Sequence, residues 1–200
     1  MSVLELLNKR FATKKFDTSK KVSDEDLAYI LECGRASASS FNVQPWKFVV
    51  VTNPELRAKL AEAGYNQAQL TEASHLIVLC AVNDPLPRVD LTHDLIEKAS
   101  GKEAADAWSG MLKGSIGYKG DALAPWLARQ SYLALQAMIL GAIDKGIDSC
   151  PMEGFDAAKW GELLGLKDAT VLANLAIGYA AEAGHPKTRL PLSELVEYRA

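Results

Sequence analysis

The sequence predicts three layers, a central sheet with helices on both faces, in either the α/β or the α+β class. Strongly apolar strands are expected at 46–52, 75–82 and 170–179, and helical patterns separate them. The chain has 200 residues, of which 48% are apolar and 24% charged, and these proportions are ordinary for a compact domain. No internal repeat or low-complexity stretch suggests a different architecture.

The first half of the chain alternates helix and strand. A helix is expected to begin at Ser23, whose hydroxyl would cap it in a variant capping box, and to end near Ala38. The run through Phe48 to Val51 is almost wholly apolar, which predicts a strand buried on both faces. Asn53 and Pro54 then start a second helix. A short helical piece at 67–73 leads into the strand at 75–82.

The second half contains a glycine-rich segment and a long apolar helix. Residues 90–120 include a helical stretch at 91–100 followed by several glycines, so we expect a partly mobile excursion of two helices with a loop. Residues 121–145 are apolar around nearly the whole circumference, which predicts a helix buried between layers or at a subunit interface. Asp156 caps a further helix before the last strand.

Composition excludes several classes of protein. The net charge is −3 and no basic run occurs, so we expect no nucleic-acid partner. The most apolar segment, 122–143, contains Arg129, Gln130 and Gln136, and therefore falls short of a membrane span. The N-terminal apolar stretch carries Glu5 and is too short for a signal-peptide core. We expect a cytoplasmic protein without a membrane partner.

The sequence offers no obvious catalytic side chain. Its three cysteines form no CxxC pair, so we expect reduced, mostly buried thiols rather than disulfides or zinc ligands. The three histidines stand alone, without the spacing of a metal site or of a nucleophile and its base, and we expect no metal. Neither GxGxxG nor a P-loop is present. If the chain is an enzyme, a bound cofactor carries the chemistry.

Four segments carry polar groups that folding alone does not require. Arg10 and Lys14 are four residues apart and would face the same way on a helical turn. Lys187 and Arg189 would project together from an extended segment, as a phosphate site requires. The other two segments are the amide-rich loop at 39–46 and the stretch 151–154. Taken singly, each also fits a solvated basic turn, an exposed surface or a loop that caps a helix.

Together the four segments resemble one family. RFATKKFD, SASSFNVQPWKF, CPMEGFD and HPKTRLP are similar to motifs of the FMN-dependent NAD(P)H nitroreductases, of the oxygen-insensitive nitroreductase and dihydropteridine reductase type. The motifs lie at both ends and in the middle, so the resemblance covers essentially the whole chain. It implies a single α+β domain over 1–200, a three-layer α-β-α sandwich with a mixed central sheet, in an intertwined homodimer. The excursion at about 85–120 would lie over the substrate pocket.

The resemblance also assigns cofactor-binding residues. Each of two FMN molecules would lie at the dimer interface and touch both subunits. The residues expected near the phosphate are Arg10, Ala12, Lys187 and Arg189. Those expected along the ribityl chain and the isoalloxazine ring are Lys14, Asn66, Gln69, Pro151, Met152, Glu153 and Gly154. Those expected from the second subunit are Ser39, Ser40 and Asn42, which would explain the polar loop.

The implied activity is an oxidoreductase that transfers a hydride from NAD(P)H through flavin N5 to a quinone or nitroaromatic in a ping-pong scheme. No side chain need act as the catalyst. Candidates to line the substrate pocket are Phe41, Trp108, Met111 and Tyr118. Two alternatives remain open. One is a flavoprotein of the same fold with different chemistry, such as reductive dehalogenation or a flavin-directed reaction. The other is a non-enzymatic flavin-binding protein.

Two positions depart from the family pattern. Ala12 stands where relatives often carry Ser, so one hydroxyl contact to the phosphate would be lost, a net effect of about 0.5–1.5 kcal/mol. Gln69 stands where relatives often carry Lys, and glutamine donates a hydrogen bond without charge.

We predict that Gln69→Lys raises the flavin midpoint potential, because a positive charge near the pyrimidine edge stabilises the anionic reduced flavin. A redox titration of the variant beside the natural protein measures it. An unchanged or lower potential would contradict the prediction.

Overall fold

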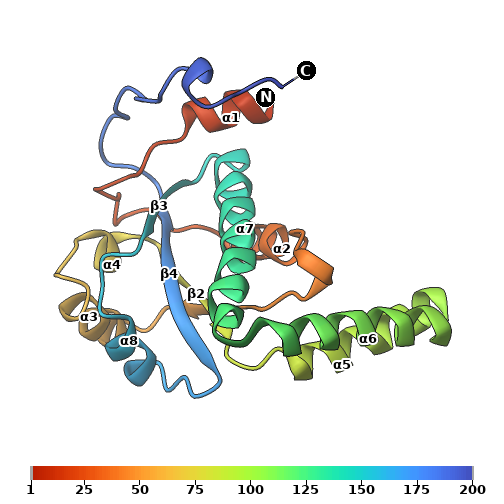
Figure 1. The fold of residues 1–200 in the computed structure, drawn as a ribbon. Helices are drawn as coiled ribbons and strands as arrows, with labels where there is room; N and C mark the ends of the chain where they lie inside the picture. The colour runs from red at the N-terminus through yellow and green to blue at the C-terminus, as the bar shows by residue number, and fades with distance from the viewer. Residues whose placement is uncertain (1, 200) are drawn as a thin grey trace.

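The expected three layers are present in the computed structural model, which describes residues 2–199; the end residues of the expected domain, 1 and 200, lie outside them. Helices α2 and α7 cover one face of a four-stranded sheet, and α3, α4 and α8 cover the other (Figure 1). The strands are β1 (Trp46–Val51), β2 (His75–Val82), β3 (Asp148–Met152) and β4 (Ala169–Gly178). The helices of the two layers are α2 (Asp24–Arg35), α7 (Leu123–Asp144), α3 (Pro54–Glu62), α4 (Gln69–Glu72) and α8 (Ala157–Leu163).

The sheet is antiparallel, and the expectation of a mixed sheet was wrong. Its order is β1-β2-β4-β3, and each neighbouring pair runs antiparallel. Among the described residues, the one parallel contact is an isolated bridge between Ala12 and Ser149. Helices that pack on an antiparallel sheet place the chain in the α+β class.

Alternation along β2 builds two cores, one on each face of the sheet. Leu76, Val78 and Cys80 pack with α3 and α8, whereas Ile77 and Leu79 pack with α2 and α7. Successive strand residues point to opposite faces, so a continuous apolar run is what a central strand needs when helices cover both sides.

The first strand is less buried than its apolar run suggested. β1 is an edge strand whose residues 47–50 are half-buried, so the expected burial is only partial, although one face of the strand packs on each core. Its outer neighbour is solvent rather than another strand. Lys47 on this edge pairs with Asp168 at 2.9 Å, a charged contact typical of a protected edge.

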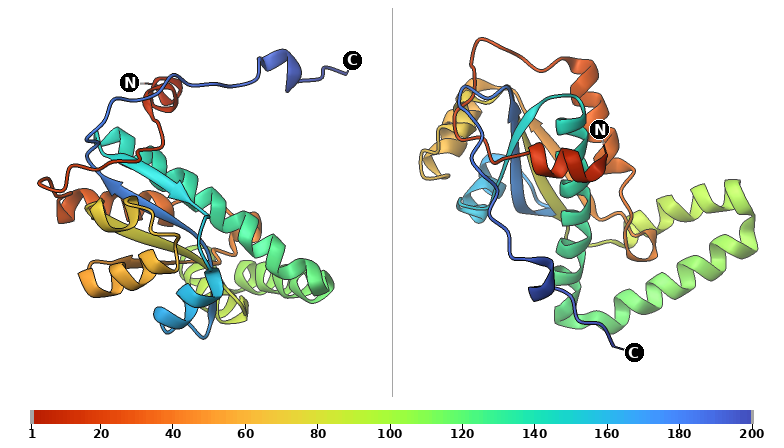
Figure 2. Two further views of the ribbon diagram at one scale, coloured as in Figure 1. Left: turned by 90° about the vertical axis from the view of Figure 1, so that its left-hand side faces the viewer. Right: turned by 90° about the horizontal axis from the view of Figure 1, so that it is seen from above.

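The glycine-rich excursion forms two helices, as expected, but with almost no loop. α5 (Leu86–Ser100) begins earlier than the predicted helix, and α6 (Lys102–Lys119) follows after Gly101, which adopts φ +89°. The hairpin projects from the body in Figure 1 and in the right view of Figure 2. Its base packs on the body through Val89, Leu112 and Ile116.

The two ends of the chain lie together. α1 (Val3–Lys9) is capped by Ser2 and Glu5 in a capping box, and it ends before Arg10. The expected helical turn joining Arg10 to Lys14 is therefore wrong, because Arg10 has extended dihedral angles. After β4 the chain is extended, apart from short 3-10 helix η3 (Leu192–Glu194), and runs past α1 (Figure 2). Within residues 2–199, no helix combines the length and hydropathy that crossing a bilayer requires.

Helix α7 approaches α2 so closely that Gly141 has no room for a side chain. A Cβ there would lie 2.7 Å from Cys33 Sγ and 3.1 Å from Cys33 Cβ. At Gly161 in α8, by contrast, nothing lies within 4 Å of an added Cβ.

We predict that Gly141→Ala lowers the free energy of unfolding by about 1–3 kcal/mol, because overpacking forces the two helices apart. The matched control is Gly161→Ala, where the same change raises helix propensity and stabilises by up to about 1 kcal/mol. Urea denaturation of both variants measures the effects, and equal stability changes would contradict the close-packing argument.

Candidate functional site

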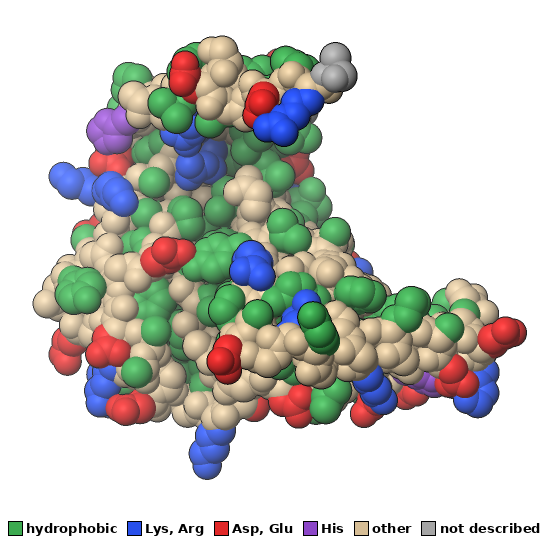
Figure 3. Space-filling view, viewed as in Figure 1, with side chains coloured by type: hydrophobic (Ala, Val, Ile, Leu, Met, Phe, Trp, Pro, Cys, Tyr) green, Lys and Arg blue, Asp and Glu red, His purple; other side chains and the backbone are tan. Residues whose placement is uncertain are grey.

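A basic cleft lies where the two ends of the chain meet the body. It has a volume of about 300 Å³. Its lining consists of Arg10, Phe11, Ala12, Lys14, His185, Pro186, Lys187, Thr188 and Arg189. Figure 3 shows Lys and Arg side chains gathered in the notch between the terminal segments and the body. The structure thus unites the two basic pairs that the sequence separates by most of its length.

Backbone contacts hold the cleft in shape. Lys187 Nζ donates to the Arg10 carbonyl at 2.8 Å, which joins the C-terminal segment to the end of α1. Ala12 bridges Ser149 of β3. Glu182 accepts hydrogen bonds from the backbone N–H of Lys14, at 2.6 Å, and of Lys15. These contacts fix the extended segment 12–16 against the sheet, and the cleft forms over it.

The cleft is electrostatically prepared for an anion. Arg10 Nη1 is buried and has no hydrogen-bond partner among the described residues. The pKa of Lys187 is lowered, first by burial and then by the nearby charges of Arg10 and Arg189. Like charges held together beside an unpaired guanidinium favour a ligand that carries negative charge and several acceptor oxygens, such as a phosphate.

The cleft continues toward the end of β3. Lys14 Nζ lies 3.5 Å from Cys150 Sγ, so its side chain is directed at this strand. Gln67 Nε2 donates to the carbonyl of Gly154 at 2.7 Å, which fixes the turn after α3 beside the segment 151–154. The same turn carries Asn66, in the left-handed region at φ +53°. Gln69 is buried at the start of α4.

A second cavity, of about 410 Å³, lies between α7 and β3. It is lined by Tyr132, Leu135, Gln136, Ile139, Pro151, Met152, Glu153 and Ala173. The Tyr132 hydroxyl donates a hydrogen bond to the Glu153 carboxylate. Burial, and then this hydrogen bond, raise the pKa of Tyr132. The pair therefore holds a phenolic proton at the mouth of a largely apolar pocket.

The polar loop 39–44 lies on a different part of the chain from the cleft. Ser39 Oγ accepts from Gln44 N–H at 3.0 Å, and Ser40 N–H donates to Gln130 Oε1 at 2.8 Å. The short 3-10 helix η1 (Ser40–Asn42) contains Phe41 and Asn42 at positive φ, and Gln44 follows at φ +44°. Such strained dihedral angles in residues other than glycine cluster at functional sites. Among residues 2–199, none of the hydrogen bonds of this loop reaches a residue that lines the basic cleft.

The four expected pocket residues divide into two groups. Trp108 Nε1 donates to the Phe41 carbonyl at 2.9 Å, so α6 and the polar loop meet. Met111 and Tyr118, also on α6, are 60% and 94% exposed. The structure therefore brings Phe41 and Trp108 together, whereas Met111 and Tyr118 are exposed to solvent on the hairpin.

Three contributors to the site were missed by sequence reasoning. Gln67 lies next to the expected Asn66 and has a similar amide, which was the only signal. Tyr132 was interpreted as part of an apolar helix face, although its hydroxyl needs a partner when buried. Glu182 showed no signal at all, because its partners are backbone groups of residues 14 and 15.

The cysteines and histidines give a mixed outcome. All three cysteines are free thiols; two are buried and Cys33 is half-buried. Burial raises the pKa of Cys80 to about 11, so this thiol is inert. His93 does not stand alone as expected, because Asp94 and Glu97 lie near it on α5, and Asp106 of α6 lies 2.9 Å from its Nε2. The i, i+4 spacing of His93 and Glu97 was visible in the sequence.

Comparisons with known proteins show which protein family the chain resembles over most of its length. The model of the nitroreductase family matches residues 7–179. The chain is 36% identical to "Putative NAD(P)H nitroreductase YfkO" of Bacillus subtilis (strain 168), over 98% of this chain and 96% of that protein. It is 32% identical to the oxygen-insensitive NADPH nitroreductase of Helicobacter acinonychis, over 97% of this chain and 95% of that protein.

A solved structure agrees. The crystal structure described as a putative nitroreductase in complex with FMN, from Exiguobacterium sibiricum 255-15, matches with a TM-score of 0.91 and 26% identity, over 100% of this chain and 98% of that chain. The chain belongs to the nitroreductase family.

We predict that Arg189→Gln raises the pKa of Lys187 toward its ordinary value of 10.5, because one of the neighbouring positive charges is removed. NMR titration of the lysine ε-methylene signal measures it. Arg199→Gln is the matched control, since Arg199 pairs with Glu197 and the pKa of Lys187 does not depend on it. A shift of equal size in both variants would contradict the local origin.

Proposed function

We propose that this protein is an FMN-dependent NAD(P)H oxidoreductase that reduces small electron acceptors of the quinone or nitroaromatic class. One observation carries the proposal: a buried, unpartnered Arg10 nitrogen in a cleft that also contains Lys187 and Arg189. The names of its relatives, which are NADPH or NAD(P)H nitroreductases, support the same activity.

The residues present fit FMN. Its phosphate would be held by Arg10, the Ala12 backbone, Lys187 and Arg189, and the unpartnered guanidinium nitrogen would gain its missing acceptor. Lys14 would lie along the ribityl chain. Asn66 and Gln69 would face the polar edge of the ring, and the segment 151–154 would pack along it. The chemistry that bound FMN would supply is acceptance of a hydride from NAD(P)H and transfer of the electrons to the acceptor.

The chain's own residues bind and tune the cofactor. Lys14 is directed at β3, and its positive charge would stabilise the anionic reduced state of a flavin bound there. Gln67 donates to the Gly154 carbonyl and so orients the peptide segment that would pack along the ring. Tyr132 and Glu153 hold a proton at the adjoining pocket, where an acceptor that gains electrons also requires protons.

A second copy would complete the site. Within the described residues, the polar loop forms no hydrogen bond to the lining of the basic cleft, so Ser39, Ser40 and Asn42 would reach the cofactor from the other subunit of a homodimer. Exposed apolar residues in the terminal segments support an interface there; they are Val3, Leu4, Leu190, Leu192 and Leu195. The hairpin of α5 and α6 would then lie over the substrate pocket, with Phe41, Trp108, Met111 and Tyr118 as its lining.

The working compartment is also a proposal. Use of NAD(P)H and three unpaired thiols support the cytoplasm, where reducing conditions keep cysteines free.

We predict that the protein loaded with FMN is yellow, that NADH or NADPH bleaches it without oxygen, and that menadione or nitrofurazone restores the colour. Anaerobic absorbance spectroscopy measures each step. A yellow protein that neither nucleotide bleaches would contradict the reductase assignment.

The phosphate contact is tested separately. Arg10→Gln should weaken FMN binding by about ten- to a hundredfold, because a hydrogen bond to a charged group is lost while the Arg10 carbonyl that anchors Lys187 remains. Arg129→Gln, on the exposed side of α7, removes the same charge away from the cleft. Equal affinities in the two variants would contradict this assignment of the cleft.

A further inference from the structure

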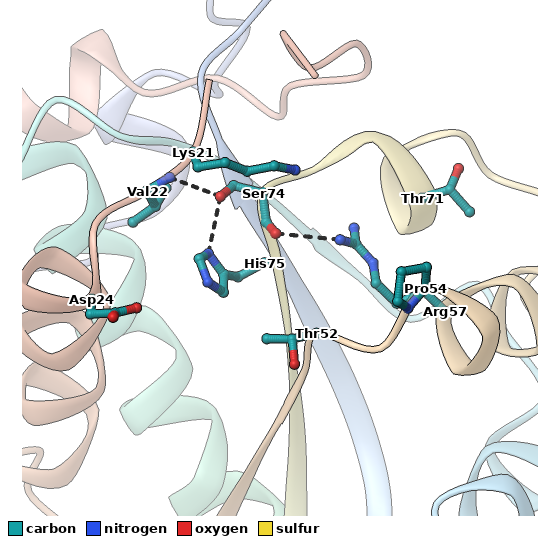
Figure 4. Close-up of a pocket in the computed structure, with 9 residues that line it drawn as sticks. All are labelled: Lys21, Val22, Asp24, Thr52, Pro54, Arg57, Thr71, Ser74 and His75. Carbon is teal, nitrogen blue, oxygen red and sulfur yellow. Dashed lines mark hydrogen bonds between the residues drawn. The ribbon is translucent and has the colours of Figure 1, made fainter. Parts of the chain in front are cut away.

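A third cavity, of about 560 Å³, opens at the start of β2, away from the basic cleft. It is shown in Figure 4, with side chains from the segment before α2, from the start of α2, from α3 and α4, and from the ends of β1 and β2. Its lining consists of Lys21, Val22, Asp24, Thr52, Pro54, Arg57, Thr71, Ser74 and His75. It shares no lining residue with the basic cleft.

Arg57 is the unusual feature of this cavity. The residue is only 6% exposed, although it lies on a short surface helix. Its Nε donates to the Leu70 carbonyl at 2.8 Å and its Nη1 to the Ser74 carbonyl at 3.3 Å. Its Nη2 is buried without a hydrogen-bond partner among the described residues.

No carboxylate compensates this charge. Within residues 2–199, neither Arg57 nor Lys21 takes part in an ion pair. Asp24 is the one acidic residue in the lining, and it is exposed. A buried guanidinium without a countercharge is costly unless another group supplies the missing acceptor.

Ser74 and His75 add an oriented donor. Ser74 Oγ accepts from Val22 N–H at 2.8 Å and lies 3.1 Å from His75 Nδ1. Ser74 donates its hydroxyl proton to Nδ1 in the tautomer of His75 that is protonated on Nε2. The neutral imidazole then carries its own proton on Nε2, which remains free to donate to a ligand.

We propose that this cavity binds a phosphate group, either free or as the ester of a small metabolite. The guanidinium, the imidazole and the ammonium group of Lys21 come from three separate elements, and Thr52 and Thr71 also belong to the lining. Donors on several sides suit a tetrahedral anion with three or more acceptor oxygens better than a planar carboxylate, which one side chain can satisfy. The volume leaves room for the rest of an ester.

Because the histidines lie in different places, their pKa values report on this cavity and on the basic cleft separately. His75 lines this cavity, His185 lines the basic cleft and His93 lies on the projecting hairpin. Burial lowers the pKa of His75 most, followed by the charges of Arg57 and Lys21, while Asp24 acts in the opposite direction. A phosphate bound among them would offset the two positive charges, and so raise the pKa of His75.

The experiment is an NMR titration of the histidine ring protons over pH, in sodium phosphate and in sodium chloride of equal ionic strength. We expect phosphate to raise the pKa of His75 while that of His93 stays the same in both salts. A change at His185 would report the basic cleft separately. A pKa of His75 that is equal in both salts would overturn the proposal.

Two variants distinguish binding of phosphate in this cavity from a general effect of positive charge on the surface. Lys21→Gln should weaken the phosphate affinity measured at His75 by about tenfold. Lys20→Gln is the matched control, because it removes the same charge at the neighbouring position. The Lys20 side chain pairs with Asp17 at 3.0 Å and does not line the cavity. Equal weakening by both would overturn the proposal. Lys21 is exposed, so its substitution leaves the structural contacts of Arg57 intact.

A further titration with glycerol 3-phosphate tests whether the ligand is free phosphate or a phosphate ester. Tighter binding than inorganic phosphate at His75 supports the ester, because the remaining cavity is then used. Equal or weaker binding assigns the site to free phosphate. Both outcomes require the response to depend on Lys21.

Discussion

The arrangement of the site depends on holding three like charges together. Arg10, Lys187 and Arg189 come from opposite ends of the chain and repel one another; burial first, and then the charges of the two arginines, lower the pKa of Lys187. The fold restrains them through backbone acceptors: the Arg10 carbonyl receives Lys187, and the Thr188 carbonyl receives Arg189. Because the extended segment after α1 is also fixed to β3, the cleft, Lys14 and the end of β3 form one continuous surface.

Much of the fold was predictable, because the central strands and the long helix show themselves as apolar runs. Strand direction was not, since an alternating or continuous pattern reports which faces are buried and not which neighbour lies alongside. For the same reason the apolar run of β1 concealed an edge strand. The glycines at 110, 114 and 117 suggested a loop, yet they lie within α6. A glycine costs a helix only about 1 kcal/mol, which packing of Leu112 and Ile116 can offset.

The site was predictable where side chains of one chemical kind recur together, as in the two basic pairs. It was not predictable where a residue acts through a distant backbone partner. Gln67 holds a carbonyl 87 residues further along the chain, and no local pattern encodes that. Arg57 occupies a helix position that resembles solvent-exposed surface, but α4 and the start of β2 cover it. Such residues become visible only when the tertiary contacts are known.

The sheet order has a consequence for biosynthesis. β2 pairs with β1, its close predecessor, on one side and with β4 on the other. During synthesis on the ribosome, the edge of β2 that pairs with β4 therefore stays unpaired until most of the second half of the chain has been made. A nascent chain with an unpaired apolar strand edge is open to aggregation, and pairing across so long a separation is slow. A chaperone that binds during translation would protect this partly paired chain. The sheet is complete only when β4, the last strand in the chain, has emerged.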